Sequence, residues 1–259
     1  MIRVGVAGAT GRMGSEVCRA VATDPDLALV AAVSRSAPGA ALRDAIGLDG
    51  DAGSVVLVEH LDELLEAAID VLVDFTGPAY APDHVAWGIE NGVHVVVGTT
   101  GFEIDEGWRD APVGVVVAPN FAIGAVLLMR FAEQAARFLP SAEVIELHHD
   151  RKLDAPSGTA LLTARRIAEA RDEAPAAPTP DGEDRGARGV DVDGVRVHSV
   201  RLPGLVAHEE VVFGGQGQTL TLRHDSTDRT SFMPGVLLAI KAAPGRPGLT
   251  QGLEPLLGV

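Results

Sequence analysis

A short segment of the chain brings together side chains that can hold and move protons. It reads Glu-Leu-His-His-Asp-Arg-Lys-Leu-Asp-Ala-Pro-Ser-Gly-Thr-Ala over residues 146–160 and contains two imidazoles and one ammonium group. A histidine with its ordinary pKa of about 6.5 donates or accepts a proton near neutral pH, and a lysine binds an anion or donates a proton. His148 and Lys152 are therefore the candidate catalytic residues.

The two adjacent histidines can serve one site only under a particular local geometry. Neighbouring residues of a regular strand point to opposite faces, so His148 and His149 share a cleft only where the strand ends, which we expect at Asp150. Other interpretations stay open: a solvated basic turn, histidines satisfied within the core, or a metal site made by these three residues. Because adjacent histidines rarely point at one ion, no metal is predicted.

A helix start follows the histidines. The pattern predicts a helix from Gly158, with Asp154 or Ser157 as its cap and Pro156 tolerated at its start. The first amide groups of a helix have no partners within the helix and attract anions. Gly158 and Thr159 are therefore candidates for binding a carboxylate.

The beginning of the chain carries a glycine-rich turn of the kind that binds a diphosphate. The sequence Gly-Ala-Thr-Gly-Arg-Met-Gly, residues 8–14, directly follows an apolar segment. Glycines in such a turn let backbone amide groups approach the pyrophosphate of a dinucleotide. Thr10 replaces the usual second glycine, so a tight structural turn is the alternative. The predicted cofactor contacts are Gly8, Ala9, Thr10, Gly11, Arg12 and Met13.

The end of the second predicted strand indicates which dinucleotide binds. An acidic side chain there would bind the ribose of NAD, but this chain has Ser34 and Arg35. Arg35 and Arg12 can pair with a 2′-phosphate, and no carboxylate at this position repels it. We therefore expect NADPH to be preferred, with NADH as the second candidate. A solvated surface arginine is the alternative for Arg35.

Two further loops are predicted at the carboxyl ends of strands, where ligands of parallel sheets bind. They offer backbone, hydroxyl, amide and aromatic groups to a cofactor. The alternative interpretation, for each loop taken singly, is an ordinary turn. The segment 74–78 lies at a comparable position, and its role is left open. The candidate cofactor residues of the two loops are Gly98, Thr99, Thr100, Ala118, Pro119, Asn120 and Phe121.

The apolar segments of the first 118 residues form the framework that positions these groups. Short runs rich in valine and leucine alternate with helical patterns, which is typical of a parallel sheet covered by helices. Continuous apolar runs indicate strands that are buried on both faces. The predicted fold class is α/β, a Rossmann-type doubly wound parallel sheet. Its expected strands are residues 2–7, 27–33, 55–58, 71–75, 93–97 and 113–117.

The later part of the chain predicts a second, smaller α+β domain with a mixed or antiparallel sheet. Residues 172–188 indicate a solvated loop, and residues 214–217 a turn between strands. We expect a dinucleotide-binding domain of residues 1–121 plus 230–259 and a substrate-binding and oligomerisation domain of residues 122–229. The expected helices are 123–139, 158–171 and 232–241, and the expected strands are 142–148, 195–202, 209–213 and 219–223.

Composition narrows the class of partner. The chain has 259 residues, of which 46% are hydrophobic and 22% charged, as in ordinary globular proteins. Its formal net charge of −15 argues against nucleic acid and anionic membranes, so a small molecule is the expected partner. A cytoplasmic location is expected because there is no membrane-length apolar run, no leader pattern, and only one cysteine, Cys18.

These motifs together resemble the 4-hydroxy-tetrahydrodipicolinate reductase family, also called the dihydrodipicolinate reductases, of diaminopimelate and lysine biosynthesis. The likeness spans nearly the whole chain. Residues 146–160 form its most specific motif, and the other motifs are residues 8–14, 74–76, 97–102 and 118–121.

The resemblance implies an NAD(P)H-dependent oxidoreductase that reduces (2S,4S)-4-hydroxy-2,3,4,5-tetrahydrodipicolinate to tetrahydrodipicolinate with loss of water. It implies that His148 is the catalytic acid or base and Lys152 the proton donor, while His149, Gly158 and Thr159 hold the dicarboxylate. It also implies a homotetramer assembled through the sheet of the second domain. Many members carry an acidic residue at the position of Ser34, which leaves dual use of NADH and NADPH open.

Two other functions stay open. One is a related two-domain NADPH reductase that acts on another small carboxylate. The other is a non-catalytic nucleotide sensor, which would keep the glycine turn but would not need His148 and Lys152.

Overall fold

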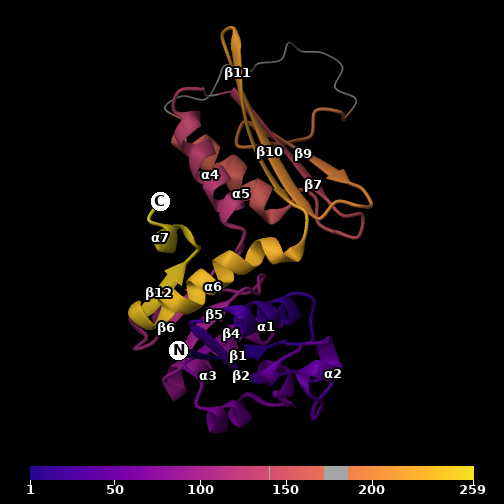
Figure 1. Ribbon diagram of the computed structural model, residues 1–259. Helices are drawn as coiled ribbons and strands as arrows, with labels where there is room; N and C mark the ends of the chain where they lie inside the picture. The colour runs from indigo at the N-terminus through magenta and orange to yellow at the C-terminus, as the bar shows by residue number, and fades with distance from the viewer. Residues whose placement is uncertain (140, 172–185) are drawn as a thin grey trace. The chain divides into compact units, whose positions relative to one another are not determined.

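The computed structural model of the protein describes residues 1–139, 141–171 and 186–259 (Figure 1). The chain divides into two compact units, Met1–Phe121 with Phe232–Val259 and Ala122–Ser231. Residues 172–185 of the expected solvated loop lie outside the described residues. None of the described helices is both long and apolar enough to cross a lipid bilayer.

The first unit is built on a seven-stranded sheet in which all neighbouring strands are parallel. The strand order β12-β6-β5-β4-β1-β2-β3 places the topological switch point between β1 and β4, where ligands of such sheets bind. The predicted Rossmann-type sheet is thus confirmed. Its strands are β1 (Ile2–Ala7), β2 (Leu27–Val33), β3 (Leu57–Val58), β4 (Val71–Asp74), β5 (His94–Val97), β6 (Gly114–Val117) and β12 (Gly248–Gln251).

Short helices connect and flank these strands. The pattern did not predict β12, which forms because its four residues pair in register with the apolar β6. The strand expected over residues 55–58 is only two residues long in the structure. The α-helices are α1 (Gly14–Thr23), α2 (Leu42–Ile46), α3 (Ala81–Asn91), α6 (Met233–Ala242) and α7 (Glu254–Leu257), and the 3-10 helices are Asp51–Ser54, Leu61–Ala67, Glu106–Asp110 and Ala243–Gly245. A further 3-10 helix, Arg229–Phe232, spans the boundary between the two units.

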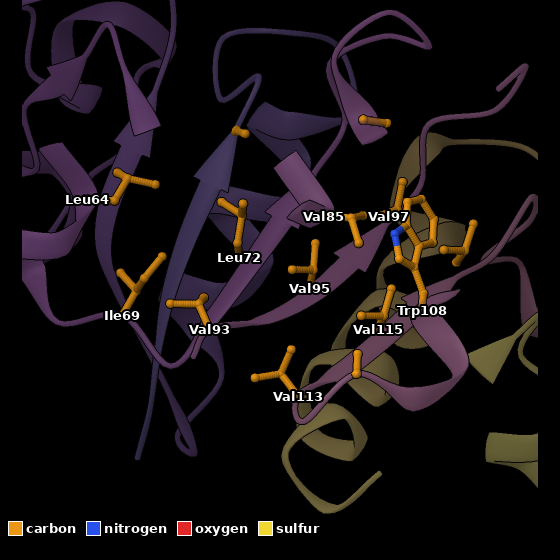
Figure 2. Packing of buried hydrophobic residues seen from close by; sticks show 14 of the residues in the cluster. Leu64, Ile69, Leu72, Val85, Val93, Val95, Val97, Trp108, Val113 and Val115 are labelled. Carbon is orange, nitrogen blue, oxygen red and sulfur yellow. The ribbon is translucent and has the colours of Figure 1, made fainter. Parts of the chain in front are cut away.

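Aliphatic side chains from the central strands form the core of the first unit (Figure 2). Val95, Val96 and Val97 of β5 are all fully buried, so this strand is covered on both faces, as its continuous apolar sequence predicts. Burial of such side chains stabilises a fold by about 25 cal/mol per Å² of apolar surface. The rigid core fixes the carboxyl ends of the strands. Figure 2 labels Leu64, Ile69, Leu72, Val85, Val93, Val95, Val97, Trp108, Val113 and Val115.

The second unit contains a five-stranded mixed sheet of order β11-β10-β7-β9-β8. β7 pairs in parallel with β9, and the other neighbours are antiparallel. The helices α4 (Ile123–Ala136) and α5 (Gly158–Ala170) cover one face of this sheet and bury Val144, Val211 and Phe213 beneath them (Figure 1). The strands are β7 (Ser141–His148), β8 (Val190–Val192), β9 (Val195–Arg201), β10 (Ala207–Gly215) and β11 (Gln218–Ser226).

The second sheet confirms the predicted mixed architecture and corrects it in detail. The turn expected over residues 214–217 is shorter, because Gly214 and Gly215 continue β10 and pair with β11. The hairpin of β10 and β11 is accordingly longer than the apolar segments indicate. β8 was not predicted, since only three residues form it, two of them exposed.

Candidate active site

The glycine turn of the first unit is too tight for side chains at two of its glycines. Gly8 has a φ of 82°, and a Cβ there would lie 2.7 Å from the carbonyl oxygen of Phe75. A Cβ on Gly14 would lie 2.1 Å from the carbonyl oxygen of Gly8. The amide of Gly11 donates to that same oxygen at 2.9 Å. The turn therefore brings bare backbone to the carboxyl end of β1.

A cavity of about 570 Å³ opens beside this turn. Its volume is in the range of small-molecule and cofactor sites. The predicted cofactor residues Gly8, Gly11, Ser34 and Arg35 line it. The remaining lining residues are Val33, Ser36, Glu59, His60, Leu61, Phe75, Thr76, Tyr80 and His84.

Hydroxyl groups occupy the place where an NAD-binding protein of this fold carries a carboxylate. Thr10 Oγ1 lies 2.6 Å from Ser34 Oγ and 2.9 Å from Ser36 Oγ, and the two serine hydroxyls are 3.0 Å apart. Thr10, which replaces the usual second glycine, thus links the turn to the end of β2. The cluster is uncharged and able to donate hydrogen bonds to an anion.

Arg35 is held over an aromatic ring at the rim of the cavity. Its guanidinium carbon lies 4.2 Å from the centroid of the Tyr80 ring, and Nη1 donates to the Tyr80 hydroxyl at 2.8 Å. Stacking of this kind orients the planar guanidinium and leaves its other donors available. The structure does not place Arg12, the other predicted phosphate partner, among the residues that line this cavity.

A buried carboxylate fixes one further histidine of the cavity. Asp74, at the end of β4, has no exposed surface and accepts hydrogen bonds from Thr99 Oγ1 at 2.7 Å and Thr76 Oγ1 at 2.8 Å. His84 Nδ1 lies 2.5 Å from Asp74 Oδ2. Burial favours a raised pKa for Asp74, but the bonds from His84, Thr99 and Thr76 outweigh it and lower the pKa. The ionised carboxylate orients the His84 ring and leaves Nε2 for a ligand.

The other predicted cofactor residues lie near these strand ends in different surroundings. A Cβ on Gly98 would lie 2.1 Å from the Phe75 ring, so only glycine fits there. Phe121 is buried, with its ring centroid 5.8 Å from that of Phe75. Ala9 and Ala118 are buried, Met13 and Asn120 are half-buried, and Arg12, Thr100 and Pro119 are exposed.

In the second unit, His148 is hydrogen-bonded to a buried carboxylate. His148 ends β7, and its Nδ1 lies 2.5 Å from Oε2 of Glu146, whose side chain has no exposed surface. The two residues are two positions apart on one strand and share a face. Because Nδ1–H donates to the carboxylate, Nε2 is the ring nitrogen left for proton transfer, as in a catalytic triad.

Arg201 holds the same carboxylate from the neighbouring strand. Its Nη1 and Nη2 donate to the two oxygens of Glu146 at 2.8 and 2.7 Å, and the amide of Ser157 donates to Oε1 at 3.1 Å. Burial acts to raise the pKa of Glu146, but the bonds from His148 and Arg201 outweigh it and lower the pKa to about 2. A fixed negative charge therefore stands behind His148.

Lys152 lies in the turn that follows His148 and is joined to the same network. Its Nζ donates to both oxygens of Asp154 at 2.8 Å, while Arg201 Nη2 donates to the carbonyl oxygen of Asp154 at 2.7 Å. The Lys152 amide donates to the carbonyl of His149 at 3.2 Å. Arg201 thus ties the loop of Lys152 to the carboxylate that orients His148.

The helix α5 begins beside this network. Of the two predicted caps, Ser157 is the one found, since its hydroxyl accepts from the Ala160 amide at 3.2 Å and Asp154 is bonded to Lys152. Gly158 is exposed and Thr159 half-buried in the first turn. Because Ser157 also donates its amide to Glu146, the helix start is anchored to the carboxylate that holds His148.

The sequence motifs did not reveal three residues that complete these sites. Tyr80 directly precedes α3 and His84 lies in its first turn, and neither belongs to a recognisable motif. Arg201 lies 55 residues after Glu146. The parallel register that pairs His148 with Arg201 is the feature that brings this arginine to the site. Within residues 1–139, 141–171 and 186–259, no three His, Cys, Asp or Glu side chains are grouped to hold a metal ion.

Comparison with known proteins places both units in one family. The family model described as "Dihydrodipicolinate reductase, N-terminus" matches residues 2–121, and "Dihydrodipicolinate reductase, C-terminus" matches residues 124–257. The 4-hydroxy-tetrahydrodipicolinate reductase of Nocardia farcinica is 54% identical over 266 residues, covering 99% of this chain and 98% of that protein. The same enzyme of Cutibacterium acnes is 51% identical over 270 residues, covering both chains completely.

A solved structure shows the same fold. The dipicolinate-bound dihydrodipicolinate reductase of Paenisporosarcina sp. TG-14 is 42% identical, covers 98% of this chain and 99% of its own, and superposes with a TM-score of 0.85. Both domain models and the full-length relatives thus point to one family. The chain belongs to the dihydrodipicolinate reductase family.

Proposed function

We propose that the protein reduces (2S,4S)-4-hydroxy-2,3,4,5-tetrahydrodipicolinate to tetrahydrodipicolinate with loss of water, using NADPH in preference to NADH. The observation that carries this proposal is the pairing of His148 with the buried, ionised Glu146 beside Lys152 and the start of α5. The arrangement offers proton transfer next to cationic groups. The relative of known structure binds dipicolinate, an aromatic dicarboxylate, which supports a dicarboxylate as the substrate.

The cavity of the first unit fits a dinucleotide. The bare backbone at Gly8 and Gly11 suits a diphosphate, and the stacked Arg35 with the hydroxyls of Thr10 and Ser34 suits a 2′-phosphate. The cluster of hydroxyls holds no carboxylate that would repel this phosphate, which supports the preference for NADPH. When bound, the reduced cofactor supplies a hydride.

The residues of the second unit then handle the charges and the proton. His148 is oriented by Glu146 so that Nε2 can give or take a proton. Lys152 offers a second proton and a positive charge. A substrate carboxylate can replace Asp154 as the partner of its Nζ. We assign both residues to catalysis.

Binding of the substrate carboxylates is assigned to the first turn of α5. Gly158 and Thr159 present amide groups at the positive end of the helix, and His149 adds a polar ring from the preceding turn. The exposure of Gly158 makes its amide accessible to a ligand.

A coupled assay tests the proposal. The substrate is generated fresh by the enzyme of the preceding pathway step, and oxidation of NADPH is followed by absorbance. We expect turnover with NADPH and a lower kcat/KM with NADH. Absence of turnover with this dicarboxylate, together with tight NADPH binding, would instead support a nucleotide sensor, and turnover of another carboxylate would support a related reductase.

We further propose that the protein is a cytoplasmic homotetramer assembled through the second sheet. The face of this sheet opposite α4 and α5 carries the half-buried apolar side chains of Ile145, Leu147 and Val212. Such a surface suits contact between copies of the chain. Light scattering on the purified protein should give four times the chain mass of 26.8 kDa; the mass of a monomer would contradict the assembly.

A further inference from the structure

A second buried carboxyl group lies next to Glu146 and has no part in the mechanism above. Glu209 of β10 is 6% exposed and pairs in register with Glu146 on β7 and with His224 on β11. Its neighbour Glu210 points to the opposite face, where it binds Arg223 at 2.7 Å. Glu209 instead faces α5, where it meets Thr163.

The contacts of the Thr163 hydroxyl indicate whether the Glu209 carboxyl group is protonated. The Thr163 Oγ1 lies 2.5 Å from Glu209 Oε1 and 3.0 Å from the carbonyl oxygen of Thr159. A hydroxyl has one proton to donate, whereas a carboxylate and a carbonyl only accept. With Glu209 ionised, one of the two contacts would lack a proton. With Glu209 protonated, it donates to Thr163 and Thr163 donates to Thr159, so both bonds form.

The surrounding charges agree with a neutral acid. The titratable groups that face Glu209 are Glu146 and His148 of β7 and His224 of β11, while Arg201 of β9 is committed to Glu146. Burial raises the pKa of Glu209 to about 7; the contact with Thr163 acts to lower it, and the negative charge of Glu146 adds to the rise. Burial also lowers the pKa of His224, which favours a neutral ring beside it.

Among the described residues, the groups that α5 and α4 are seen to place against Glu209 and its neighbour His224 are neutral. From α5 the facing side chain is Thr163, which is fully buried. From α4, Gly124 lies against the His224 ring, and Leu128 belongs to the apolar cluster of this unit. An ionised Glu209 would therefore be a buried charge without a counterion, and burial of such a charge costs free energy of folding.

We propose that Glu209 is a positioning residue that acts as a neutral acid: through Thr163 it fixes the first turn of α5, and it keeps a second negative charge away from Glu146 and His148. Its effect on turnover rests on the function proposed above, because Thr159 and Gly158 of that turn are the assigned substrate contacts. Loss of the proton would release Thr163 from one of its two bonds and add a charge that repels a dicarboxylate.

The protonation state can be measured without any turnover. Carbon-13 NMR of protein labelled at the glutamate carboxyl carbons identifies Glu209 as the resonance missing from the Glu209→Gln variant. We expect this resonance to titrate near neutral pH. A midpoint near the ordinary glutamate pKa of about 4.3 would overturn the inference, whether or not the protein is active.

Kinetics test the positioning role. The KM of the wild type for the dicarboxylate should rise severalfold, roughly three- to tenfold, between about pH 6 and pH 9, while kcat changes less. Glu209→Gln keeps a donor for Thr163 and cannot ionise, so its KM should stay low and flat over this range. Thr163→Val, which preserves shape, should raise KM at every pH.

Glu169→Gln serves as the matched control, because it removes an exposed carboxylate from the same helix and should follow the wild type. A KM profile of Glu209→Gln that rises as in the wild type would overturn the positioning role. If no variant turns over the dicarboxylate, the proposed function fails, while the NMR titration still decides the state of Glu209.

Discussion

The imidazole Nδ1 of His148 lies 2.5 Å from Oε2 of Glu146, a carboxylate with no exposed surface. Because Arg201 and the Ser157 amide hold the same carboxylate, its position is fixed from three directions. The imidazole therefore has one orientation and one free nitrogen. This relationship converts an ordinary strand-end histidine into a group suited to proton transfer.

Replacement of the buried carboxylate should weaken proton transfer without affecting the cofactor. Glu146→Gln removes the carboxylate that holds Nδ1 of His148 and leaves Arg201 without its ionic partner. We expect kcat to fall by about 100-fold or more, because the His148 ring loses the partner that orients it. NADPH affinity, measured by fluorescence titration, should be unchanged because Glu146 lies in the second unit. An unaltered kcat would contradict the role of this ion pair.

Lys152 can be tested against its neighbour in sequence. Lys152→Ala should lower kcat by roughly two orders of magnitude or more while NADPH still binds. Arg151→Ala removes an exposed cation from the same turn and should change kcat and KM little. Steady-state kinetics of the two variants separate a specific role from a general loss of positive charge. Near-normal turnover of Lys152→Ala would refute its assignment.

Cofactor preference should follow the charge at the end of β2. Ser34→Asp places a carboxylate among the hydroxyls of Thr10 and Ser36, where it would repel a 2′-phosphate and accept bonds from a ribose. We expect the ratio of kcat/KM for NADPH to that for NADH to fall by about tenfold or more. Tyr80→Phe keeps the ring beneath Arg35 but removes the hydroxyl bond, so its effect should be smaller. A wild type that prefers NADH would contradict the assignment of Ser34 and Arg35.

The buried carboxylates predict a loss of stability in acid. The pKa of Glu146 is lowered from 4.5 to about 2 in the folded protein, so the unfolded chain binds its proton first as pH falls. Stability from this group is complete above about pH 4.5 and is lost towards pH 2, on the order of 3 kcal/mol in total. The lowered pKa of Asp74 acts in the same direction.

Urea unfolding at a series of acidic pH values measures this effect. The free energy of unfolding of the wild type should decrease as pH falls through this window. Glu146→Gln, which cannot ionise, should show a shallower decrease. Equal slopes for the two proteins would mean that the ion pairs of Glu146 contribute nothing to folding.

The parts of the fold that follow from local pattern were predictable. β1 and β2 match the expected residues, because both are rich in apolar residues and bounded by turns. β12 could not be predicted from local pattern, since its formation depends on pairing with β6, more than 130 residues earlier. A segment with such sparse apolar character becomes a strand only when a neighbouring edge is available.

The residues of the candidate sites also fall into those that a local motif predicts and those that only the three-dimensional structure brings together. His148, Lys152 and the glycine turn were visible because their chemistry is concentrated in short motifs. Arg201 and Glu209 reach the network through the register of β9 and β10 with β7, and sequence alone does not give this register. His84 and Tyr80 reach the cavity through the start of α3.

A structure of the protein with NADP⁺ and dipicolinate would show whether the residues assigned to catalysis meet the bound acid. We expect His148 Nε2 and Lys152 Nζ to lie within hydrogen-bond distance of the bound dicarboxylate, with one carboxylate on the amides of Gly158 and Thr159. Glu146 should keep its bonds to His148 and Arg201. A complex in which Lys152 and both histidines point into solvent, away from the bound acid, would refute their assignment to the site even with the dinucleotide bound at the glycine turn.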